Sequence, residues 1–80
     1  MPTVLRKYGF EIVIRTHDHS PPHVHVLIGG EEVVINLGND RSDPEIREIR
    51  GMSRQNIRRA MDIVLAHQES IMMAWNRIHG

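Results

Sequence analysis

The stretch "HVHVLIGGEEVVIN", residues 23–36, decides the fold. Two runs rich in β-branched residues flank Gly29-Gly30, and a two-glycine connection between such runs is a strong signal for a β-hairpin. Because side chains alternate along a strand, one face of this hairpin is apolar and the other is mostly polar. His23 and His25 then share the second face and point away from the core.

A second hairpin is predicted by "TVLRKYGFEIVIRT", residues 3–16, with a tight turn at Tyr8-Gly9. An opposite-charge pair supports the expected register. The pairs expected here are Thr3 with Ile14, Val4 with Val13, Leu5 with Ile12, and Arg6 with Glu11. In the central hairpin, the expected pairs run from Ile28 opposite Glu31 to His23 opposite Asn36.

The C-terminal half predicts a short strand followed by a helix. The segment "EIREIR", residues 45–50, fits an edge strand, and Ser53 fits a helix N-cap. Apolar residues then recur with helical spacing, so one helix is expected over residues 53–78. The predicted fold is therefore α+β, a single domain over residues 1–80. Its antiparallel sheet has four strands, or five with residues 45–50, and is packed by one long C-terminal helix.

The predicted helix is long for a domain of this size. At about 1.5 Å per residue it measures roughly 39 Å, whereas the compact domain is only about 30 Å across. Its apolar sector is also wide. We therefore expect the helix to overhang its own sheet and to be covered by a second copy of the chain, in a homodimer, or by a small partner protein.

The composition excludes several classes of protein. Ten Lys and Arg balance ten Asp and Glu, so the net charge provides no general attraction to nucleic acid or membrane. The absence of cysteine excludes disulfides and thiolate metal sites and fits a reducing compartment. No window approaches the roughly 20 apolar residues of a membrane helix, and no secretory signal is recognisable. We expect a cytoplasmic protein without membrane contact.

Histidine is over-represented, at six of 80 residues, and four of the six lie in "HDHSPPHVHV", residues 17–26. Two imidazoles at positions i and i+2 of a strand lie about 6.5–7 Å apart at Cα, so both can reach one metal ion. His19 is a third candidate ligand, because a stiff Pro-Pro corner can fold it back over the same face. One interpretation is therefore a site for zinc or another divalent metal, made by His19, His23 and His25.

The same histidines also support chemistry without a cofactor. Side by side, His23 and His25 can act as general base and general acid in the cleavage of an RNA phosphodiester, with His19 as an auxiliary group. This interpretation predicts a metal-independent, ribonuclease-like activity. A third interpretation is a non-catalytic binding or regulatory module, in which the histidines only shape an interface.

Arginines are concentrated around the expected start of the helix. Positive charge in the first helical turns opposes the helix dipole and costs about 0.3–1 kcal/mol per residue. An arrangement that opposes local stability is typical of an anion-binding patch, because helix N-termini already attract phosphate. Arg50, Arg54 and Arg58 are therefore candidate phosphate or nucleic-acid contacts. The alternative is that neighbouring carboxylates, such as Glu48 and Asp62, neutralise them.

The signature residues also identify a family resemblance. "HSPPHVH" at residues 19–25, followed by Gly29-Gly30, resembles the His-x-Pro-Pro-His-x-His signature of domain-of-unknown-function (DUF) family 4160, a family of small prokaryotic proteins. The resemblance covers nearly the whole chain, with Ser20 where the family usually has Asn. His17 lies outside the signature and is not expected to be a ligand.

The resemblance also implies a biological setting. Family members are often encoded beside a small protein of DUF family 2442, which implies a toxin–antitoxin-like or regulatory two-gene module. The leading hypothesis is therefore a component of a bacterial module that binds a protein partner and RNA through its histidine pair.

Overall fold

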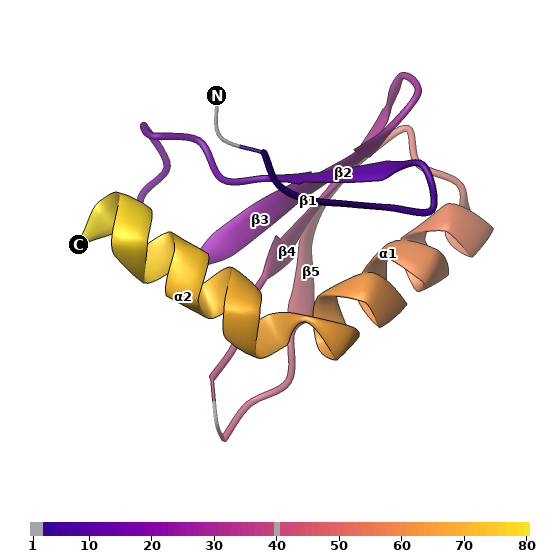
Figure 1. The fold of residues 1–80 in the computed structure, drawn as a ribbon. Helices are drawn as coiled ribbons and strands as arrows, with labels where there is room; N and C mark the ends of the chain where they lie inside the picture. The colour runs from indigo at the N-terminus through magenta and orange to yellow at the C-terminus, as the bar shows by residue number, and fades with distance from the viewer. Residues whose placement is uncertain (1–2, 40) are drawn as a thin grey trace.

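A computed structural model describes residues 3–39 and 41–80, and it has an α+β fold. Five antiparallel strands form one sheet in chain order: β1 (Thr3–Lys7), β2 (Phe10–Val13), β3 (His23–Ile28), β4 (Glu31–Asn36) and β5 (Glu45–Arg50). Two helices, α1 (Arg54–Ala66) and α2 (Gln68–His79), follow and pack against one face of the sheet (Figure 1). The predicted fold class is confirmed, and residues 45–50 are indeed a fifth strand.

The register of the central hairpin is as predicted, from Ile28 opposite Glu31 to His23 opposite Asn36. The N-terminal hairpin agrees only near its turn, where Leu5 faces Ile12 and Arg6 faces Glu11. Beyond these pairs the register shifts, and Thr3 pairs with Val13. The predicted pairs Thr3–Ile14 and Val4–Val13 are therefore wrong. An extra residue at Val4 moves the partner by one, as in a β-bulge.

The prediction of one long C-terminal helix is wrong in one respect, because the helix breaks at His67. The backbone of His67 has φ −123° and ψ 19°, outside the helical region. Gln68 begins α2, and its side-chain amide donates a hydrogen bond of 2.6 Å to the backbone oxygen of Leu37. The two helices measure roughly 20 and 18 Å at 1.5 Å per residue, and the described chain extends 32 × 28 × 20 Å. The overhang that suggested a partner chain is therefore not present.

The core lies between the two helices and the sheet face that they cover. Alternate strand residues fill this face, and the break at His67 lets both helices contribute buried side chains to it. The sheet residues of the core include Ile12, Val24, Val26, Val33 and Ile35, and the helix residues include Ala60, Ile63, Val64, Ile71, Ala74 and Trp75; Ile14, just after β2, joins them. The predicted N-cap is also present, since the Ser53 hydroxyl accepts a hydrogen bond from the Asn56 backbone N–H at 3.2 Å.

The β1–β2 turn places a tyrosine where a smaller residue is preferred. Tyr8 and Gly9 have φ angles of +53° and +84°, the signs required by a turn that favours Asn-Gly. A tyrosine in this left-handed region costs about 1–2 kcal/mol. Its ring is 81% exposed, and its contact with the Lys7 ammonium, 5.6 Å from the ring centroid, recovers about 0.5 kcal/mol.

We therefore expect Tyr8→Asn to stabilise the protein by about 0.5–1 kcal/mol. The change is measured from the midpoint of urea-induced unfolding. Tyr8→Phe keeps the ring and the backbone strain, so its midpoint should match that of the wild type. An asparagine variant no more stable than the phenylalanine variant would contradict this account of the turn.

Candidate metal centre

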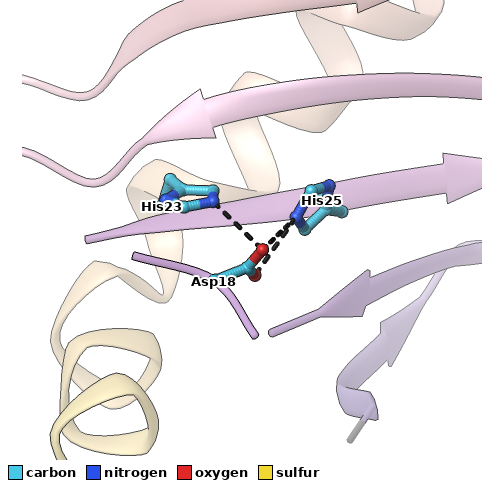
Figure 2. A group of neighbouring side chains, drawn as sticks. All are labelled: Asp18, His23 and His25. Atoms are coloured by element: carbon cyan, nitrogen blue, oxygen red, sulfur yellow. Dashed lines mark hydrogen bonds and ion pairs between the residues drawn. The ribbon is translucent and has the colours of Figure 1, made fainter. Parts of the chain in front are cut away.

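His23 and His25 are the first and third residues of β3, so both point to the sheet face opposite the helices. The loop between β2 and β3 crosses this face and brings Asp18 over them (Figure 2). A local turn shapes the loop. The Arg15 backbone N–H donates to Asp18 Oδ2 at 2.9 Å, and the Asp18 N–H donates to the Arg15 oxygen at 3.0 Å. The carboxylate is thereby held toward β3.

Three side chains converge beneath this loop. The Nε2 atom of His25 lies 3.1 Å from both carboxylate oxygens of Asp18, and the Nε2 atom of His23 lies 3.4 Å from Oδ1 (Figure 2). One donor atom from each of the three residues lies within 4.8 Å of the other two. Both histidines are only 5% exposed, so their expected outward orientation is correct but the loop buries them.

The other ring nitrogen of each histidine has its own acceptor. His23 Nδ1 lies 2.9 Å from the backbone oxygen of Pro21, and His25 Nδ1 lies 2.9 Å from Glu32 Oε2. When both Nδ1 atoms carry the proton and donate to these oxygens, both Nε2 lone pairs face Asp18. Metal-binding histidines show this arrangement, in which an outer oxygen fixes the tautomer.

Two arginines provide an alternative hydrogen bond to the same Nδ1 atoms. Arg47 Nη1 lies 3.1 Å from His23 Nδ1, and Arg15 Nη1 lies 3.0 Å from His25 Nδ1. A guanidinium can only donate, so this hydrogen bond requires an Nδ1 without a proton. In that tautomer Nδ1 cannot also donate to the oxygen. The proton then sits on Nε2 and is donated to Asp18. The site thus has two proton arrangements, one closed by internal hydrogen bonds and one with both Nε2 atoms free to bind.

The charges around the site are nearly balanced. Burial raises the pKa of Asp18, but hydrogen bonds from the Arg15 backbone and the His25 ring outweigh it and hold the pKa below its usual range. Asp18 is therefore ionised at neutral pH. Glu32 forms an ion pair with Arg50 at 3.1 Å and a longer one with Arg15 at 3.7 Å. Arg50 also forms an ion pair with Glu48.

The end of α2 closes one side of the site. The Trp75 ring lies 5.4 Å from the His23 ring and 4.1 Å from the His79 ring, measured between centroids. His79 Nε2 also lies 3.2 Å from the backbone oxygen of Arg15, at the base of the Asp18 loop. These contacts of His79 tie α2 to this loop.

The structure brings together only some of the residues predicted for the site. His23 and His25 are adjacent, with ring centroids 5.4 Å apart, whereas His19 is exposed and lies outside the convergent group. His17 is also exposed, as expected for a residue outside the signature. Asp18, next to His19 in sequence, takes the third position. The residues "HDHSPP" show that this loop is polar, but they do not identify which side chain turns toward the sheet.

The predicted arginine patch is divided between two parts of the molecule. Arg50 lies on β5 and reaches Glu32 beside the histidines. Arg54 and Arg58 lie exposed on α1, which packs on the other face of the sheet. The arginines that contact the imidazoles are Arg15 and Arg47, and neither is among the three predicted phosphate contacts.

One cavity of about 500 Å³ is lined by neither His23 nor His25. It is bounded by the β1–β2 turn and α1, with Tyr8, Phe10 and Ile63 among its lining residues. Its lining is mainly apolar, and it contains none of the convergent donors. Asp18, His23 and His25 are therefore packed together under a loop and do not line this cavity.

The sequence profile of the family described as "domain of unknown function (DUF4160)" matches residues 9–76. The chain belongs to this family. The match includes Asp18 and both buried histidines, together with β2–β5, α1 and most of α2. Searches of the curated proteins and of the solved structures return no match. Within the described residues, neither helix has the length and apolar character needed to cross a membrane.

Proposed function

We propose that the protein binds a divalent transition-metal ion, with zinc the best fit, through His23 Nε2, His25 Nε2 and the Asp18 carboxylate. The observation that carries this proposal is the convergence of both Nε2 atoms on one ionised carboxylate. Two imidazoles and one carboxylate form a donor set that zinc uses in proteins. Asp18 thus replaces His19 in the metal site inferred from sequence.

The donor distances support the proposal. Ligands about 2.0–2.1 Å from a tetrahedral zinc ion lie roughly 3.3–3.4 Å from each other. The Asp18 Oδ1 atom lies 3.1 Å from one imidazole Nε2 and 3.4 Å from the other. The two Nε2 atoms lie within 4.8 Å of each other, so an ion that replaces their protons would also draw the two imidazoles together.

The outer hydrogen bonds support it as well. Pro21 oxygen and Glu32 carboxylate accept from the two Nδ1 atoms, which orients each ring and increases the basicity of its Nε2. Three protein ligands leave the fourth position of a tetrahedral ion for water or a ligand. Asn36, opposite His23 on β4, has a buried Oδ1 without a hydrogen-bond partner among the described residues, and it is a suitable acceptor for such a molecule.

The test is a zinc titration of protein made without a histidine tag and stripped of metal with a chelator. Calorimetry should show one ion per chain, and free zinc at 100 times the dissociation constant should raise the free energy of unfolding by about 2.7 kcal/mol. The matched control is His19→Ala, which removes an exposed histidine of the same loop and should bind equally. Absence of saturable binding, or its loss in His19→Ala, would refute the proposed ligand set.

A second candidate function is metal-independent cleavage of RNA by the same two histidines. The observation that favours it is the pair of arginines beside the imidazoles, Arg15 and Arg47, because guanidinium groups bind phosphate well. Burial of both rings means that the Asp18 loop must open to admit a phosphodiester. RNA cleavage that persists in excess chelator and disappears in His23→Ala would favour this candidate over the metal site.

The family resemblance supports a further proposal, that the protein works in a two-gene module with a small partner protein. This proposal about a partner protein is independent of the proposed metal site. Co-expression of the protein with the product of the neighbouring gene, followed by purification of the complex, tests this proposal. Failure of the two proteins to co-purify would count against it.

A further inference from the structure

Strand β5 is an open edge of the sheet. It lies last in the strand order, after β4, and no strand in the described part of the chain pairs with its outer side (Figure 1). All six of its residues are exposed. Ile46 and Ile49 are 46% and 52% exposed, which is unusual for large apolar side chains on an unpaired edge.

The sequence of β5, "EIREIR", is complementary to itself when reversed. We infer that β5 pairs antiparallel with β5 of a second copy of the chain, across a two-fold axis between Arg47 and Glu48. In this register every acidic residue meets a basic one, and each isoleucine meets an isoleucine. The pairs are Glu45 with Arg50, Ile46 with Ile49, and Arg47 with Glu48, each formed twice in the dimer.

The irregularity within β5 makes this register geometrically consistent. In a regular strand, Ile46 and Ile49 would point to opposite faces. Here Ile46 pairs with Ile35 and Glu48 pairs with Val34, so Arg47 is an extra residue, as in a β-bulge. Ile46 and Ile49 therefore both lie on the helix-covered face of the sheet, beside the core residues Ile35 and Val33.

The charged residues of β5 lie on the other face. Arg47 reaches His23 there, and Glu48 and Arg50 reach each other, Arg50 also pairing with Glu32. The order of helix-facing and opposite-facing residues along β5 is thus the same in both chain directions. Residues that pair between the two copies therefore lie on the same face of the sheet. The partner's Glu48 would lie opposite the arginine that contacts His23, so the interface and the histidine site share a residue.

Charges and bulges on an edge strand normally prevent pairing with other strands. They do so because an arbitrary strand leaves the charges unpaired or places like charges together. A second β5 places an opposite charge across from each of them, so the same residues discourage unrelated strands and accept a copy. The four isoleucines of the dimer would form one apolar cluster on the helix-covered face, with the paired charges on the other face.

Light scattering tests the dimer with the full chain. Wild-type protein at about 0.5 mM should scatter with twice the 9.2 kDa mass of one chain, and the double variant Ile46→Lys/Ile49→Lys should scatter as a single chain. Leu65→Lys and Met73→Lys are matched controls, because these side chains are 49% and 61% exposed on the helices. Both controls should remain dimeric. A monomeric wild type, or a double variant as dimeric as the controls, would overturn the inference.

A charge exchange tests the same register with variants that keep both isoleucines. Glu45→Arg and Arg50→Glu each create two like-charge pairs per homodimer, and each should weaken self-association by about tenfold. Mixed together, they restore both opposite-charge pairs and should form the heterodimer preferentially, as measured by native mass spectrometry. A mixture that shows no preference for the heterodimer would exclude this register.

Discussion

Replacing His25 with alanine should abolish stoichiometric zinc binding and destabilise the metal-free protein by about 2–4 kcal/mol. The imidazole is 5% exposed and lies between two carboxylates, with Nε2 3.1 Å from Asp18 and Nδ1 2.9 Å from Glu32. Its removal creates a cavity and leaves the two carboxylates without the donor between them. Arg50 still pairs with Glu32, so the expected loss lies below that of a fully uncompensated buried charge.

The measurement is urea-induced unfolding in the presence of chelator, followed by a zinc titration of the same sample. His19→Ala is again the matched control, because it removes an exposed imidazole from the adjacent loop. Its stability should equal that of the wild type within about 0.5 kcal/mol. If His25→Ala were as stable as His19→Ala, or bound zinc as tightly as the wild type, the site described above would be wrong.

Gly38→Ala should be the other severely destabilising substitution, at about 3 kcal/mol or more. Gly38 has φ +70°, and a Cβ atom added there would lie 2.4 Å from the backbone oxygen of Ser42 and 2.8 Å from that of Asp43. Backbone atoms cannot move aside as a flexible side chain can. The preceding Leu37 is fully buried and its oxygen accepts the hydrogen bond from Gln68, so displacement of this segment disturbs the start of α2.

Gly29→Ala separates the cost of the positive φ from the cost of the backbone clash, the two contributions to the loss expected at Gly38. Gly29 also has a positive φ of +56°, but an added Cβ would have no atom within 4 Å. We expect its substitution to cost only the conformational term, about 1–2 kcal/mol. The difference between the two variants in unfolding free energy then measures the backbone clash at Gly38. Equal losses would show that no such clash exists.

The central hairpin and its register could be predicted because several local signals agree. Two glycines sit between two alternating runs, and a period of two fixes which side chains share a face. This geometry alone places His23 and His25 side by side on the face opposite the helices. Ser53 was also recognisable, since a serine before a periodic apolar segment is a common helix start.

The break between α1 and α2 could not be predicted for a physical reason. No proline or glycine lies near His67, and the apolar periodicity continues through it. The break depends on tertiary contacts, among them the bond from Gln68 to Leu37, a residue 31 positions away. The shift in β5 that leaves Arg47 as an extra residue is likewise a property of strand pairing and has no mark in the sequence.

The position of Asp18 beside the histidine pair could not be predicted, for a similar reason. The loop between β2 and β3 has no periodicity that decides which of its polar side chains turns toward the sheet. The inward position of Asp18 follows from the turn it makes with Arg15, whereas histidine content and the family signature drew attention to its neighbour His19. A histidine pair could be read from the strand, but its carboxylate partner depended on the folded loop.

Crystallography of the zinc-loaded protein at the zinc absorption edge tests the central claim most directly. Anomalous scattering locates the ion without reference to activity or to any partner. The account predicts one peak per chain within about 2.0–2.2 Å of His23 Nε2, His25 Nε2 and an Asp18 carboxylate oxygen. No peak at this position, or a peak bound instead by His17 or His19, would contradict it.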